Sequence, residues 1–125
     1  MIADVQCVVL DCSEPTKLAE FYQTLLGGAV NQEDRRWALG DGWATLHTRS
    51  GLVLAFQRVA DHMPPQWPDS TQPQQLHLDL GVADLDRAHE QVLASGARVL
   101  DDGSGGRSWR VYADPAGHPF CLVRH

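Results

Sequence analysis

The chain repeats one order of sequence patterns twice, and this repeat constrains the fold more than any other feature. In each half, a short apolar run is followed by a helical pattern and then by short strand-like runs separated by turns. The expected helix starts, Glu14 and Asp84, lie 70 residues apart, and the helix-ending Gly28 and Gly96 lie 68 apart. The first helix is therefore predicted to be about two residues longer. Because one such unit cannot cover its own sheet face, the pattern predicts two βαβββ modules in an α+β fold.

The first half begins with a predicted strand at 5–12, where β-branched residues are frequent. Ser13 is a candidate N-cap for the helix that follows, and Pro15 falls in its first turn, where a missing N–H costs little. Gly27 and Gly28 supply the stop signal. The apolar stripe of this helix consists of Leu18, Phe21, Tyr22, Leu25 and Leu26. Further strands are predicted at 36–39, 43–48 and 52–58, with an Asp-Gly turn after the first of them.

The second half repeats this order. A strand is predicted at 76–82, then a helix with Asp84 as N-cap that ends at Ser95 and Gly96. Further strands are predicted at 98–100, 109–112 and 119–124. The segment 61–73 between the halves is rich in proline, which neither a sheet ladder nor a helix interior tolerates. We therefore predict one domain, 1–125, with modules 1–60 and 74–125 joined by a linker at 61–73.

Composition limits the partners and the compartment. A formal net charge of -6 repels phosphate backbones and anionic membranes, so neither nucleic acid nor a membrane is an expected partner. We find neither a leader-like N-terminus nor a run of about 18 apolar residues, and we expect a cytoplasmic protein. The cysteines are odd in number and lack C-x-x-C spacing, which favours reduced thiols.

Three phrases carry a resemblance to a known family. They are VVLDCSEPTKLAEFYQTLLGG near the start, QLHLDLGVADLDRAHEQVLASGARV at 75–99 and VYADPAGHPFCLV at 111–123. Their order resembles that of glyoxalase-like domains, the glyoxalase, bleomycin-resistance and dioxygenase group known as the vicinal oxygen chelate superfamily. The resemblance implies two modules whose mixed sheet curves around a cleft, and a homodimer. In metal-dependent members it implies a His on the first and fifth strands and a Glu on the fourth and eighth.

The metal-ligand positions that the resemblance implies can be compared with this chain one residue at a time. His77 stands seven residues before Asp84, where the resemblance places the second-module histidine, and Cys7 holds the same place before Glu14. Cys121 occupies the closing-strand position where a glutamate is common. Its first-module counterpart is Ala55, with Gln57 two residues on and on the same strand face.

Strand alternation predicts which side chains face this cleft. His77 and Asp79 should face it, while Leu76, Leu78 and Leu80 should meet a helix. By the same parity the inward-facing residues are Cys7 and Val9 on the first strand, and Pro119, Cys121 and Val123 on the last. The rings of Trp43, Phe56, Trp67 and Trp109 are candidate cleft walls.

The usual metal-binding carboxylates are missing, so no metal is expected. If one is present, His77, Cys7 and Cys121 could hold zinc with a water in fourth place. Both thiols are more simply explained as buried packing groups than as nucleophiles.

We predict that the protein binds a small organic molecule through His77, Asp79, Cys7, Val9, Cys121 and Gln57, and catalytic residues cannot be assigned. A metal-dependent lyase, isomerase or dioxygenase is one alternative. A drug- or toxin-sequestering protein of the bleomycin-resistance type is the other.

Overall fold

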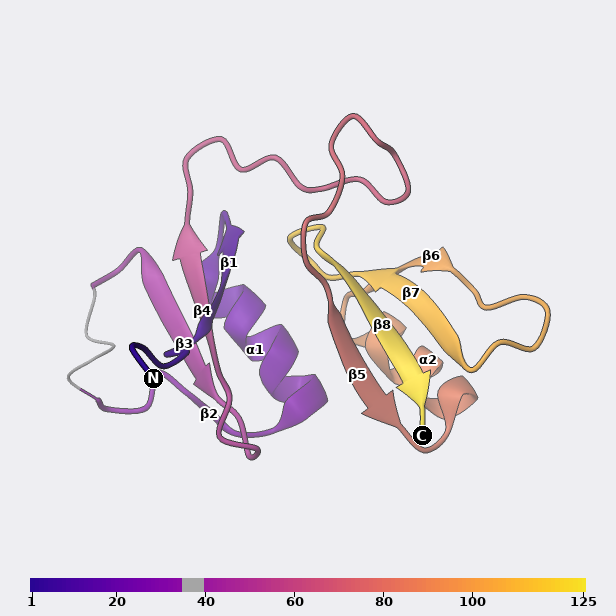
Figure 1. The fold of residues 1–125 in the computed structure, drawn as a ribbon, viewed down its shortest axis with the longest axis horizontal. Coiled ribbons are helices and arrows are strands. Elements are labelled where there is room, and N and C mark those ends of the chain that lie inside the picture. Colours follow the sequence, from indigo (N-terminus) through magenta and orange to yellow (C-terminus); the bar gives the residue numbers. More distant parts are fainter. Residues whose placement is uncertain (35–39) are drawn as a thin grey trace. The chain divides into compact units, whose positions relative to one another are not determined.

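The computed structural model describes residues 1–34 and 40–125, which form two compact units, Met1–His62 and Met63–His125. In the first unit the elements are β1 (Val8–Cys12), α1 (Pro15–Leu26), β2 (Ala29–Val30), β3 (Trp43–His47) and β4 (Val53–Arg58). In the second they are β5 (Leu78–Val82), α2 (Leu85–Ala94), β6 (Arg98–Asp101), β7 (Trp109–Ala113) and β8 (Pro119–Arg124). Figure 1 shows this repeated order, which confirms the predicted α+β class with two βαβββ modules.

Each unit contains a four-stranded mixed sheet with the same connectivity. The strand order is β1-β4-β3-β2 in the first sheet and β5-β8-β7-β6 in the second. The first strand of each unit pairs in parallel with the last, and the remaining neighbours are antiparallel. Corresponding residues can therefore be read from the register: Val9 lies opposite Ala55 as Asp79 lies opposite Cys121. The register supports the internal repeat independently of the helix spacing.

The two helices differ in length as predicted, with 12 residues in α1 and 10 in α2. Pro15 occupies the first turn of α1, but the N-cap is Glu14 and not the predicted Ser13, and no side chain caps this helix. Asp84 caps α2 as predicted, since its Oδ1 accepts a hydrogen bond of 3.1 Å from the Arg87 backbone N–H. Neither helix, within the described ranges, is long and apolar enough to cross a membrane.

Each unit has its own core, and both cores contain a stacked Tyr–Phe pair. In the first unit Tyr22 from α1 stacks on Phe56 from β4, with ring centroids 5.9 Å apart. In the second unit Tyr112 from β7 stacks on Phe120 from β8 at 5.6 Å. All four side chains are at most 1% exposed. The phenylalanine of the pair comes from the last strand in both units, but the tyrosine comes from a helix in the first unit and from a strand in the second.

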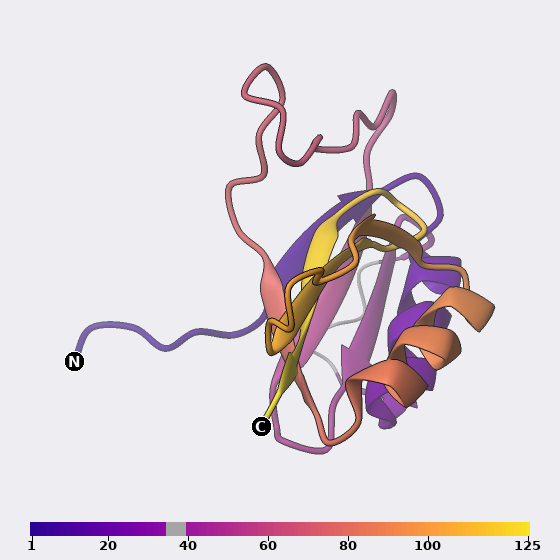
Figure 2. The same cartoon turned by 90° about the vertical axis from the view of Figure 1, so that its right-hand side faces the viewer.

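Strand boundaries differ from the sequence prediction at several places. β1 begins at Val8 and not at residue 5, because the preceding segment runs away from the sheet, as Figure 2 shows, with Val5 85% exposed. Leu76 lies before β5 and is 82% exposed, so the prediction that it meets a helix is wrong. β2 was not predicted, and the strand predicted at 36–39 lies outside the described residues.

Candidate functional site

The second unit contains a cavity of about 380 Å³ on the open side of its sheet. Five lining residues are apolar or aromatic, and four carry polar groups. This combination of apolar walls with few polar groups is typical of small-molecule sites, and the volume lies within their usual range of about 300 to 1,000 Å³. The lining residues are Trp67, Gln74, His77, Asp79, Trp109, Val111, Pro119, Cys121 and Val123.

Strand register explains why these side chains share one face. Asp79 on β5 lies opposite Cys121 on β8, and Val111 on β7 lies opposite Cys121 from the other side. Trp109 lies opposite Val123 two residues further along the same strands. Because alternate residues point to opposite faces, the intervening Phe120 and Tyr112 enter the core beneath the sheet. The site is thus the reverse side of a well-packed sheet.

His77, Asp79 and Cys121 form a compact polar cluster within this cavity. The His77 Nε2 lies 3.2 Å from the Asp79 Oδ1, and the donor atoms of all three residues lie within 4.8 Å of one another. The imidazole and carboxylate side chains are 42% and 61% exposed, whereas Cys121 is half-buried. A bound molecule could therefore reach the imidazole and the carboxylate directly.

The Cys121 thiol is strongly held in its protonated form. Burial, and then the negative charge of Asp79 with its hydrogen bond to the thiol, raise the pKa of Cys121 from 9.0 to about 11. A more distant contribution comes from the charge of Asp101. Because the nucleophile is the thiolate, a group with this pKa is a poor nucleophile at neutral pH. Cys121 therefore lines the cavity as an uncharged thiol.

Replacing Asp79 with asparagine should lower the pKa of Cys121 and increase its reaction with iodoacetamide at pH 8. We expect the rate to rise about three- to tenfold, because removing the nearby negative charge increases the thiolate fraction. Mass spectrometry of the alkylated peptides measures this rate. Cys7 is an internal reference, since burial alone raises its pKa and its rate should not change. An unchanged Cys121 rate would mean that burial is the whole cause.

The wall formed by Trp109 is held in place from outside the cavity. The Arg107 guanidinium carbon lies 4.1 Å from the Trp109 ring centroid, a cation–π distance. Arg107 is itself fixed by an ion pair with Asp101, and Asp101 accepts a further hydrogen bond of 3.0 Å from the Gly103 backbone N–H. The indole therefore presents a fixed surface to the cavity, which reduces the entropy lost on binding.

Gln74 contributes an unused hydrogen-bond acceptor. Its Oε1 is buried and has no hydrogen-bond partner among the described residues. A buried acceptor without a donor is costly, because folding removes its hydrogen bonds to water. Gln74 lines the cavity, but this oxygen is itself inaccessible, so a bound molecule would meet it only after the side chain rotated.

The cluster His77, Asp79 and Cys121 could also hold a metal ion. Its nitrogen, oxygen and sulfur donors suit zinc, which accepts three protein ligands and keeps a fourth position open. A hard cation is poorly served by the thiol. Zinc would have to displace the Cys121 proton, which the high pKa makes costly. The donor set thus fits zinc chemically, at the expense of a tightly held proton.

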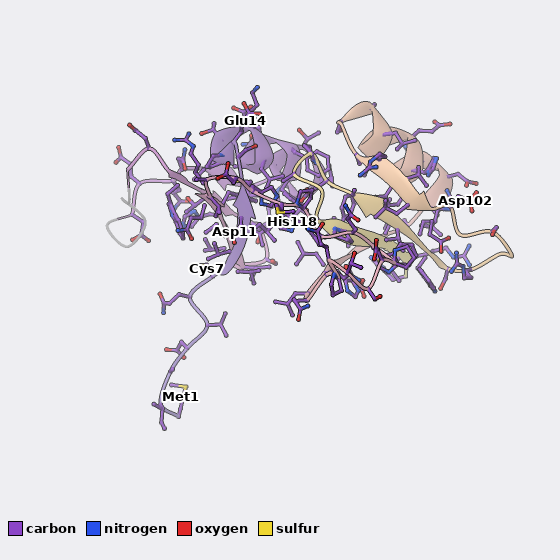
Figure 3. All side chains as sticks on the ribbon, turned by 90° about the horizontal axis from the view of Figure 1, so that it is seen from above. Met1, Cys7, Asp11, Glu14, Asp102 and His118 are labelled. Atoms are coloured by element: carbon purple, nitrogen blue, oxygen red, sulfur yellow. The ribbon has the colours of Figure 1, made fainter. Side chains whose placement is uncertain are left out.

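The structure brings together part of the predicted site. His77, Asp79 and Cys121 lie in one cavity, and Pro119 and Val123 line it as well. The predicted ligand contacts Cys7, Val9 and Gln57 belong to the first unit and do not line this cavity. Figure 3 labels Cys7 immediately before β1. Of the candidate aromatic walls, Trp67 and Trp109 line the cavity, whereas Phe56 is fully buried in the first core.

Sequence reasoning missed Gln74 and Val111 as cavity residues. Val111 could have been found from the register, since an antiparallel neighbour of the closing strand must place one residue beside Cys121. Gln74 had no such signal, because it lies in a proline-containing segment without periodicity. Its position depends on tertiary packing of that segment.

Comparison with known proteins points to one family. The sequence model of the glyoxalase-like domain matches residues 7–123, nearly the whole chain. No curated protein matches.

Solved structures with the same fold are distant in sequence. A hypothetical protein from S. aureus has a TM-score of 0.70 at 17% identity, with each chain fully covered. A glyoxalase/bleomycin resistance protein/dioxygenase family enzyme from Burkholderia phytofirmans PsJN has a TM-score of 0.71 at 14% identity, covering 98% of each chain. A mutant of the fosfomycin resistance protein FosX from Listeria monocytogenes, in complex with Mn(II) and 1S,2S-dihydroxypropylphosphonic acid, has a TM-score of 0.70 at 15% identity. The match covers 98% of this chain and 93% of the FosX chain. These likenesses establish the fold.

Proposed function

Because this chain belongs to the glyoxalase-like domain family, we propose that its second unit binds a small organic molecule in the cavity lined by Trp67 and Trp109. One observation carries the proposal: two indoles and a cluster of polar groups line a cavity large enough for a small ligand. Binding does not require a metal, because the exposed His77 and Asp79 side chains offer polar contacts directly. We also propose that the protein forms the homodimer that the family resemblance implies.

The phosphonic acid bound by FosX is not a good candidate ligand for this cavity. None of the described residues that line it is a lysine or an arginine, and Asp79 is a carboxylate. A phosphonate would therefore lack the cationic partner that such an anion needs, unless a metal supplied the charge. Sharing a fold with FosX does not imply that this protein binds the same ligand.

A fragment screen tests the binding proposal. We expect saturation-transfer NMR to identify planar aromatic fragments that bind the purified protein, and Trp109→Ala to weaken each of them about tenfold. An aromatic wall contributes both buried apolar area and ring contacts, which together account for such a change.

Trp43→Ala is the matched control, since Trp43 lies opposite Gln57 on the first sheet as Trp109 lies opposite Val123 on the second. It should leave each affinity within about twofold. The proposal is wrong if no fragment binds, or if every fragment binds Trp109→Ala as well as the unchanged protein.

A zinc-dependent function is the second candidate, favoured by the cluster of three donors. His77, Asp79 and Cys121 would hold the ion, which would supply a Lewis acid for polarising an oxygen of the bound molecule. Metal analysis of the purified protein distinguishes the candidates: zinc in a one-to-one ratio that His77→Ala abolishes favours the metal, whereas fragment binding that survives a chelator favours the metal-free site.

A further inference from the structure

The charged groups around the cavity of the second unit restrict what it can bind. Asp79 is the single carboxylate among the described lining residues, and its side chain is 61% exposed. The His77 Nε2 lies 3.2 Å from one oxygen of this carboxylate. No lysine or arginine is among the described lining residues, so the carboxylate faces no permanent cation within the cavity.

The hydrogen-bonding groups point the same way. The Asp79 carboxylate accepts hydrogen bonds at each oxygen, and its side chain is exposed to the cavity. A ligand that binds this carboxylate must present N–H or O–H donors. A ligand with acceptors alone would face the Asp79 carboxylate without a donor to offer it.

The walls favour a flat, positively charged group. Trp67 and Trp109 both line the cavity, and the faces of indole rings attract cations. Trp109 already accepts one cation, since the Arg107 guanidinium lies 4.1 Å from its ring centroid without lining the cavity. Because Asp101 is ion-paired with Arg107, the charge of that guanidinium is balanced at short range. It therefore does not exclude a second cation from the cavity side.

We infer that the cavity selects a planar organic cation with N–H donors, such as an amidinium or a guanidinium, over anions of the same shape. This inference rests on the proposed binding function and adds the chemical class of the ligand. Asp79 would pair with the positive charge and accept its N–H hydrogen bonds, and the indoles would line the flat group.

Three probes of one shape test the inference: benzamidinium, benzamide and benzoate. They differ in charge but share the ring and the size of the substituent. At low ionic strength, where screening is weak, we expect benzamidinium to bind at least about tenfold more tightly than benzoate, with benzamide between them. Dissociation constants come from NMR titration of the tryptophan indole N–H signals, with Trp109→Ala identifying the signal that belongs to the cavity.

Asp79→Asn should reduce the preference for benzamidinium to within about twofold. Asp102→Asn is the matched control, because it removes the same charge from an exposed position in the loop between β6 and β7, labelled in Figure 3, outside the cavity. It should keep the preference unchanged.

The outcomes separate this inference from the proposal beneath it. A preference that Asp79→Asn removes and Asp102→Asn keeps supports the planar cation. Equal or tighter binding of benzoate, a preference unchanged in Asp79→Asn, or no binding of any probe while other fragments bind would overturn the inference and leave the binding function standing. If neither the probes nor the fragments bind in a Trp109-dependent way, both fail.

Discussion

Gly28→Ala should destabilise the protein by about 3 kcal/mol or more. Gly28 has φ of +88°, a region that costs an alanine roughly 1 to 2 kcal/mol. In addition, a Cβ at this position would lie 2.2 Å from the His47 carbonyl oxygen, which belongs to the backbone of β3 and cannot move alone. The turn from α1 into β2 must therefore shift away from the sheet. Urea unfolding followed by circular dichroism measures the free energy of unfolding.

Gly51→Ala separates the two causes of this effect. Its φ is +92°, nearly that of Gly28, but nothing lies within 4 Å of the Cβ that the substitution would add. The expected loss is therefore the backbone cost of about 1 to 2 kcal/mol alone. If Gly28→Ala proved as mild as Gly51→Ala, the close approach of Gly28 to the β3 backbone would not exist in solution.

The fold was largely predictable because the periodicities are strong and occur twice. The stripe from Leu18 to Leu26 fixed one helix, and Asp84 fixed the start of the other through its side-chain cap. Boundaries failed where tertiary contacts decide them. Val5 has the residue type of a strand but leaves the sheet, and Leu76 has an apolar side chain before its strand begins. Local preference cannot say where a pairing partner stops.

The candidate site was predictable where it depends on strand alternation. His77 and Asp79 share a face because they are two residues apart, and Cys121 joins them through the parallel pairing of β5 with β8. Gln74 comes from a segment without a repeating pattern, so its approach to the cavity could not be predicted, whereas Trp67 from the same segment was a candidate wall because of its ring alone. The sequence also could not reveal that burial, and then Asp79, raise the pKa of Cys121, since both effects depend on the packing of these groups.

Phe120→Ala should cost about 3 to 5 kcal/mol, the range for removing a fully buried aromatic ring. Phe120 is 0% exposed and stacks on Tyr112 at 5.6 Å with an interplanar angle of 23°. Its removal leaves a cavity that the sheet and α2 can close only in part. Urea unfolding again measures the loss, which is a large fraction of the total stability of a typical domain. A loss below about 1 kcal/mol would mean that this core is loosely packed.

Phe120→Leu keeps the fold measurable if the alanine variant does not fold. It preserves much of the apolar volume, so we expect it to cost less than half as much as the alanine substitution. Phe120 points into the core, whereas its neighbours Pro119 and Cys121 point into the cavity. Fragment affinities measured on folded Phe120→Leu should therefore stay within about twofold while its stability falls. If fragment affinity fell together with stability, the shape of the cavity would depend on the packing of Phe120 in the core. The core and the candidate site would then form one cooperative unit.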